Sequence, residues 1–228
     1  MYITDLDWIK PKTERDKAAK IKDLLRELAE DKAAQFNFSF GCYGNPNADV
    51  IFMPEIPSLS AKEVISEAYS KQPQELWKTA WKVTIGDYLF RIALHENDFI
   101  PEELGPLSDE PWKWNCWITD FVKNAEYTNK WNRMSKAEKS QALEVNRDFL
   151  MRELKILNEP PKPIRWIIFV GKKTESYFLK HLRVKLDDGF KFESDWIYHY
   201  AWPKSSDDRK EFRRRFKEVS ETMKSSTG

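Results

Sequence analysis

Four short apolar runs alternate along this chain with longer segments of helical periodicity, and this alternation constrains the fold more than any other feature. The runs cover residues 50–53, 114–122, 165–170 and 196–201. Continuous apolar runs of this length are typical of strands that are covered on both faces. Because each intervening segment is long enough for a right-handed crossover, the pattern predicts an α/β fold. We expect a three-layer α/β/α sandwich with a central, mainly parallel four-stranded sheet.

The helical segments supply the outer layers of this predicted fold. An N-terminal amphipathic helix is expected at about residues 12–34. Ser135 and Glu138 have the spacing of a capping box at a helix start. Further helices are expected from residue 60 and over residues 75–94, 135–157, 174–182 and 206–223. With 228 residues and no internal repeat, the chain is expected to form a single domain over residues 1–228.

The overall charge says little about a partner. Thirty-eight Lys and Arg oppose 37 Asp and Glu, giving a formal net charge of +1, so contact with a polyanion would need local clustering of positive charge. The chain has no apolar run of about 18 or more residues. Residues 1–15 are too charged for the apolar core of a signal peptide. We therefore expect a soluble, cytoplasmic protein with no membrane partner.

Cysteine and histidine are too few and too scattered to indicate a metal centre. Cys42 and Cys116 are far apart in the sequence, and both are expected to be reduced and packed in the interior. Together with His95, His181 and His199 they show no metal-ligand spacing. The sequence therefore indicates no metal and no other cofactor.

Glu55 is a candidate site residue because it comes directly after the first apolar run, between Pro54 and Pro57. Ligands of open α/β sheets bind outside the carboxyl ends of the strands. A carboxylate at this position could act on a substrate or orient a ligand. It could also be a solvated turn residue.

The ends of the four runs, taken in order, carry a series of motifs. They read ADVIFMPEIPS from residue 48, WITDFVK from residue 117, WIIFVG from residue 166 and IYHYAWPKSS from residue 197. This series resembles the uracil-DNA glycosylase superfamily over roughly residues 41–216. In that family the four strands end in motifs like Gly-Glu-Ala-Pro-Gly, Thr-Asn-x-x-Lys, Leu-Gly-Lys and His-Pro. A loop that enters the DNA minor groove follows the last motif.

The first motif keeps the acid of the family and departs from it elsewhere. Glu55 and Pro57 are retained, whereas Pro54 and Ser58 replace the two glycines. Iron–sulfur members of the family place cysteines near the position of Cys42, but they need four and this chain has two. The resemblance therefore implies no metal cluster.

The second motif changes the residue that reads the base. Asp120 stands where the family has an asparagine. Because a carboxylate can only accept hydrogen bonds, Asp120 would favour a base edge rich in donors, such as an exocyclic amine, or would need to be protonated. Asp120 could equally cap the turn after its strand.

The resemblance implies two catalytic residues. Glu55 would activate water or stabilise the sugar cation, and His199 would donate to the base oxygen on which charge develops. The fourth motif has two registers, because His199 matches the family histidine by residue type and Trp202-Pro203 matches the His-Pro step by position. His199 could instead be a core histidine with its hydrogen bonds satisfied.

Two aromatic residues receive binding roles from the resemblance. Trp81 would stack on the flipped base, or it could be a core tryptophan on its helix. Trp202 and Lys204 would form the loop inserted into DNA.

Phosphate contacts are expected from hydroxyl and cationic side chains. Ser58, Ser205 and Ser206 would touch phosphates, although Ser205 or Ser206 could be the N-cap of the last helix. Arg209 and Arg213 belong to a basic cluster on that helix. Such a cluster is either an electrostatic DNA footprint or a solvated helix face.

The leading hypothesis is a monofunctional DNA glycosylase of base excision repair, a hydrolase that cleaves the N-glycosidic bond of a deaminated or modified base flipped out of DNA. DNA is the expected partner, and a monomer is the expected state. One alternative is a catalytically inactive member of the superfamily that binds nucleic acid or a nucleotide. Another is a small-molecule enzyme on the same scaffold.

Overall fold

The computed structural model describes residues 16–30, 42–55, 85–101, 111–122, 133–183, 186, 190–200 and 202–226. These residues form an α/β fold in which helices pack around a five-stranded mixed sheet. The predicted α/β class is therefore confirmed. The parts of the chain that carry Ser58 and Trp81, and the helix expected from residue 60, lie outside the described residues.

The sheet has the strand order β1-β3-β2-β4-β5. The strands are β1 (Cys42–Gly44), β2 (Val50–Pro54), β3 (Trp117–Thr119), β4 (Trp166–Val170) and β5 (Glu193–Ile197). The pairs β3–β2, β2–β4 and β4–β5 are parallel, and β1 runs antiparallel to β3. The predicted number of four strands is wrong. The reason is that β1 spans only 3 residues and is too short to produce a recognisable apolar pattern.

Two strand boundaries also differ from the prediction. The run at residues 114–122 forms only the short strand β3, preceded by the 3-10 helix η2 (Pro111–Lys113). β5 begins earlier than the predicted residues 196–201, at Glu193. Because β5 is an outer strand, its first residues can be polar and exposed, which hides them from a search for apolar runs.

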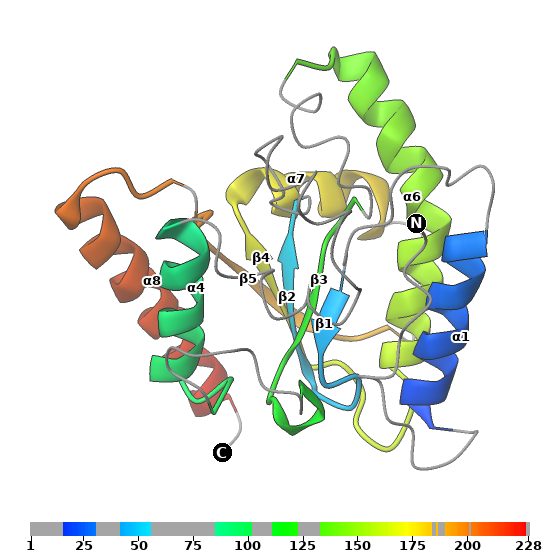
Figure 1. The fold of residues 1–228 in the computed structure, drawn as a ribbon, viewed down its shortest axis with the longest axis horizontal. Coiled ribbons are helices and arrows are strands. Elements are labelled where there is room, and N and C mark those ends of the chain that lie inside the picture. Colours follow the sequence, from blue (N-terminus) through cyan, green and yellow to red (C-terminus); the bar gives the residue numbers. More distant parts are fainter. Residues whose placement is uncertain are drawn as a thin grey trace, which may run out of the picture.

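Five helices surround the sheet in the described part of the chain. They are α1 (Lys17–Glu30), α4 (Ile85–Glu96), α6 (Lys136–Leu157), α7 (Lys172–His181) and α8 (Ser206–Ser225). In Figure 1, α4 and α8 lie on one side of the sheet, and α1 and α6 lie on the other. The predicted capping box at the start of α6 is confirmed, since the Ser135 hydroxyl accepts from the Glu138 backbone and the Glu138 carboxylate accepts from the Ser135 backbone.

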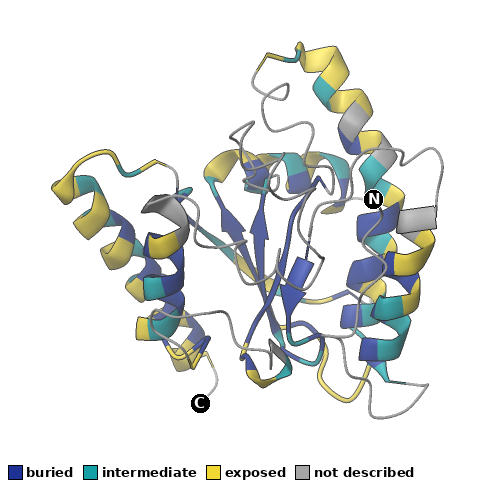
Figure 2. Cartoon of the chain, viewed as in Figure 1, coloured by how far each residue is buried: buried dark blue, intermediate teal, exposed yellow. Residues whose placement is uncertain are grey.

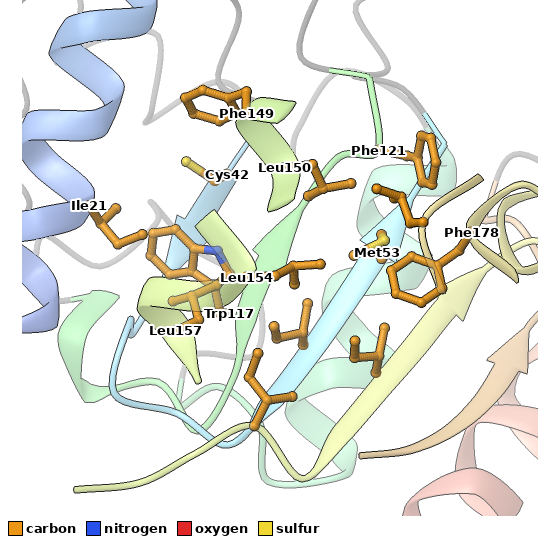
Figure 3. Packing of buried hydrophobic residues seen from close by; sticks show 14 of the residues in the cluster. Ile21, Cys42, Met53, Trp117, Phe121, Phe149, Leu150, Leu154, Leu157 and Phe178 are labelled. Atoms are coloured by element: carbon orange, nitrogen blue, oxygen red, sulfur yellow. The ribbon is translucent and has the colours of Figure 1, made fainter. Parts of the chain in front are cut away.

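Successive residues of the central strands face two separate hydrophobic clusters, as the pleat of a β-strand requires. In β2, Ile51 and Met53 belong to the cluster that packs against α1, α6 and α7. Val50 and Phe52 belong to the cluster that packs against α4 and α8. Figure 2 shows that the sheet is buried between these helices, and Figure 3 shows the first cluster in close view.

A buried carboxylate fixes β3 against α6. Glu153 is fully buried, and its Oε1 atom accepts hydrogen bonds from Trp117 Nε1 at 3.0 Å and from Thr119 Oγ1 at 2.8 Å. The acid is therefore satisfied by two side chains of the strand that leads into Asp120.

Candidate functional site

The carboxyl ends of four neighbouring parallel strands bring the predicted acid, base-reading residue and histidine to one edge of the sheet. Asp120 follows β3, Glu55 follows β2, Gly171 follows β4 and His199 lies beyond β5. Backbone hydrogen bonds continue past the strands, from Val122 N to Glu55 O at 3.0 Å and from Gly171 N to Ile197 O at 2.8 Å. The backbone pairing of β2 with β3, and of β4 with β5, is thus extended at this edge.

Glu55 lies beside the point where the strand order reverses. From β2 the chain passes to β3 on one side, and β4 then pairs with the opposite side of β2. The crevice at such a switch point is where open α/β sheets bind ligands. Since Pro54 pairs with Val170, Glu55 and Gly171 are the residues that follow the two strands at this switch point.

Gly171 allows the imidazole of His199 to approach the end of β4. Its φ of +99° is a conformation that residues with a side chain rarely adopt. A Cβ added at Gly171 would lie 3.6 Å from the Cβ of His199 and 3.8 Å from its Cδ2 atom. The histidine side chain therefore packs over the glycine at the start of α7.

The environment of His199 favours the neutral imidazole. Burial lowers the pKa of His199 from 6.5 to about 4. The ring stacks on that of the buried Tyr200, with the ring centroids 4.5 Å apart. At neutral pH the side chain is uncharged, so it can donate from only one ring nitrogen.

Tyr177 of α7 is a further candidate site residue, which was not expected from the sequence. The half-buried ring has its pKa raised, first by burial and second by the negative charge of Glu55. Tyr177 therefore lies within electrostatic reach of the candidate acid. Its one sequence signal is its place in the second turn of the helix that follows β4.

Asp120 is almost completely buried, with 5% of its surface exposed. It follows Thr119, which the carboxylate of Glu153 holds in place. Burial of a carboxylate requires hydrogen-bond donors around it. Asp120 is therefore a constrained side chain at the end of β3.

Trp202 closes the turn that begins at His199. The Trp202 backbone N–H donates to the His199 carbonyl oxygen at 2.8 Å. Its indole stacks on the ring of Tyr198, with centroids 4.5 Å apart and an angle of 22° between the planes. The two residues that competed for the fourth motif thus have different surroundings, with His199 packed over Gly171 and Trp202 40% exposed.

The hydroxyl of Ser205 has a structural role at the start of α8. Ser205 is the N-cap, and its Oγ atom accepts a hydrogen bond from the backbone N–H of Asp208. The Asp208 carboxylate accepts in return from the backbone N–H groups of Ser205 and Lys204. The Ser205 hydroxyl can still donate its own proton to a phosphate. Ser206 is exposed at the first position of the helix.

Most of the positive charge on α8 is neutralised by nearby carboxylates. A groove of about 550 Å³ between α4 and α8 is lined by cations that all have such partners. The pairs are Lys210–Asp207, Arg213–Glu96, Arg214–Glu211, Lys217–Glu221 and Lys224–Asp98. Arg213, one of the expected DNA contacts, is therefore engaged with Glu96. Arg209 and Lys204 have no carboxylate partner among the described residues.

A comparison with known protein families and with curated proteins gave no match to this chain. The function is therefore inferred from the site itself. Within the described residues, no three His, Cys, Asp or Glu side chains are grouped so that they could hold a metal ion. The helices described here include none that is both long and apolar enough to cross a membrane.

Proposed function

We propose that this chain hydrolyses the N-glycosidic bond of a deaminated or otherwise modified base that is flipped out of DNA. The observation that carries the proposal is the placement of Glu55 and His199 on either side of Gly171, at the switch point of the sheet. Four parallel strands with helices on both faces also support the three-layer α/β/α arrangement of the uracil-DNA glycosylase superfamily as the finer description of the fold.

Cleavage of this bond leaves negative charge on the base and positive charge on the sugar. A neutral imidazole is suited to stabilising the negative charge on the base, because it can donate a hydrogen bond to a base oxygen without carrying charge of its own. The low pKa of His199 keeps its imidazole neutral at physiological pH. The carboxylate of Glu55 is suited to the positive charge on the sugar, because it can stabilise the sugar cation or orient a water molecule that attacks it.

Asp120 gives the proposed site a preference among bases. A buried carboxylate accepts hydrogen bonds and donates none, so it pairs with an exocyclic amine or a ring N–H better than with a carbonyl oxygen. We expect bases with donors on the exposed edge to be released faster than uracil.

A panel of oligonucleotides carrying uracil, hypoxanthine, xanthine or a modified cytosine tests the proposal. Release of a base leaves an abasic site that breaks in alkali. Glu55→Gln should lower the rate by about 10²- to 10⁴-fold, and Glu221→Gln, on the far end of α8, should leave it unchanged. If no member of the panel yields a break with the folded protein, the proposal fails. Salt-dependent DNA binding without release would then indicate the inactive, nucleic-acid-binding alternative.

A further inference from the structure

The strongest feature outside the proposed catalytic residues is a row of three aromatic rings along the outer strand β5 and the turn after it. Trp196 contacts Tyr198 edge to face, with centroids 5.2 Å apart, and Tyr198 stacks on Trp202. The Tyr198 hydroxyl donates to Glu211 of α8 at 3.3 Å. Tyr198 is therefore held between Trp196 and Glu211, and its ring supports the ring of Trp202.

Trp202 has one ring face against Tyr198 and remains partly exposed to solvent. The exposed fraction of the residue is 40%. An exposed indole held in this way offers a large flat surface without the entropic cost of ordering a mobile side chain. A side chain that intercalates between base pairs must stack on a base with each of its two faces, whereas one face of the Trp202 ring is already stacked on Tyr198.

The charge around the row is suited to a nucleic-acid strand. Lys172 lies over the Trp196 ring, with Nζ 5.1 Å from the centroid. Lys204 and Arg209 follow Trp202 in the chain. Within the described residues none of these three cations is paired with a carboxylate, whereas Asp207, Asp208 and Glu211 nearby are all engaged. These three cations therefore remain available to contact the phosphates of a strand.

We propose that the ring face of Trp202 turned away from Tyr198 stacks on an unpaired nucleobase next to the base in the site, and that the substrate is single-stranded DNA. A base in a duplex is already stacked on both sides, so it gains little from a single flat surface, whereas an unpaired base gains a stacking partner. The turn that joins His199 to Trp202 keeps the Trp202 backbone within hydrogen-bond distance of the carbonyl oxygen of the candidate catalytic histidine. The inference rests on the proposed function for the identity of the nucleic acid.

Fluorescence anisotropy with a labelled single strand of mixed sequence, and with its duplex, tests this inference at low salt. The single strand should bind more tightly than the duplex. Trp202→Ala should weaken binding of the single strand by about tenfold or more, and Trp202→Phe should retain most of the affinity. Leu179→Ala removes an exposed apolar side chain of α7 outside the row and should change nothing.

The variant Glu55→Gln separates this inference from the proposed function. It should bind the single strand as the wild-type protein does while base release is lost. Tighter binding of the duplex, or unchanged affinity in a folded Trp202→Ala protein, would overturn the role of Trp202 even if base release is observed. Binding of the single strand that depends on Trp202, without release of any base, would support the stacking surface and count against the glycosylase.

Discussion

The backbone N–H of Trp202 and the carbonyl oxygen of His199 are joined by a hydrogen bond of 2.8 Å. This bond closes a tight turn after β5, with the imidazole packed over Gly171 and the indole stacked on Tyr198. One turn therefore presents a neutral hydrogen-bond donor and a flat apolar surface at the same edge of the sheet.

Substitution of Gly171 should cost stability through backbone strain. Gly171→Ala would force a side chain into a φ of +99°, and we expect a loss of about 1–3 kcal/mol in the free energy of unfolding. Gly44→Ala is the matched comparison, because its added Cβ would lie only 2.4 Å from the carbonyl oxygen of Cys116 at a φ of +125°. Gly44→Ala should therefore be the more destabilising. Urea denaturation of both variants measures the order, and a Gly171→Ala protein as stable as the wild type would contradict the conformation described here.

The stability of the protein should fall in mild acid because of His199. Its pKa is lowered from 6.5 to about 4 in the folded state, so the unfolded state binds more protons between these values. The stabilising contribution of the neutral ring is complete above pH 6.5 and is lost as the pH falls toward 4. The loss is at most about 3 kcal/mol.

Comparison of the wild-type protein with His199→Gln isolates this effect. Urea denaturation across the pH range should give a shallower slope for the variant below pH 6.5 and parallel curves above it. An NMR titration of the His199 ring gives the folded-state pKa directly. A midpoint near that of a free histidine would show that the ring is not buried.

Loss of Glu153 should destabilise the protein strongly. Glu153→Ala leaves the buried donors of Trp117 and Thr119 without an acceptor, and each unsatisfied donor costs about 1–3 kcal/mol. Glu153→Gln keeps an oxygen at the same place and should cost less. Thermal or urea denaturation measures both variants, with Glu221→Ala on the surface of α8 as the control. Equal stability of the alanine and glutamine variants would show that these hydrogen bonds contribute little.

Both thiols should be inert until the protein unfolds. Cys42 and Cys116 are buried and form no disulfide, as expected from the sequence, and burial raises the pKa of the Cys116 thiol. A buried thiol at neutral pH presents almost no thiolate, which is the reactive species. A thiol-specific chromogenic reagent should react slowly with the native protein and rapidly in denaturant. Rapid reaction of either cysteine under native conditions would show that the packing around its thiol opens in the folded protein.

The sequence predicted the parts of the fold in which local pattern and tertiary environment agree. Central strands such as β2 and β4 are buried on both faces, so their apolar runs show directly in the sequence. The start of α6 was predicted from Ser135 because a capping box is a local interaction. β1 and the polar start of β5 could not be predicted, because β1 is only 3 residues long and the first residues of β5 are polar, so neither gives an apolar run.

The candidate site was predictable only in part. Glu55, Asp120 and His199 were expected at strand ends, and the structure places them at one edge of the sheet. Tyr177 and the stacking of Trp202 on Tyr198 could not be foreseen, because both depend on where α7 and the last turn pack. The pairing of Arg213 with Glu96 likewise joins helices that the sequence does not relate.

The two outer strands of the sheet differ from the inner ones in a way that bears on self-association. β1 is only 3 residues long, and β5 begins with Glu193, Ser194 and Asp195. Short length and charge are the features by which natural proteins keep exposed strand edges from pairing with those of other molecules. Addition of a strand from a second copy is therefore disfavoured at both margins, which should protect concentrated solutions from growth of fibre-like aggregates along the sheet.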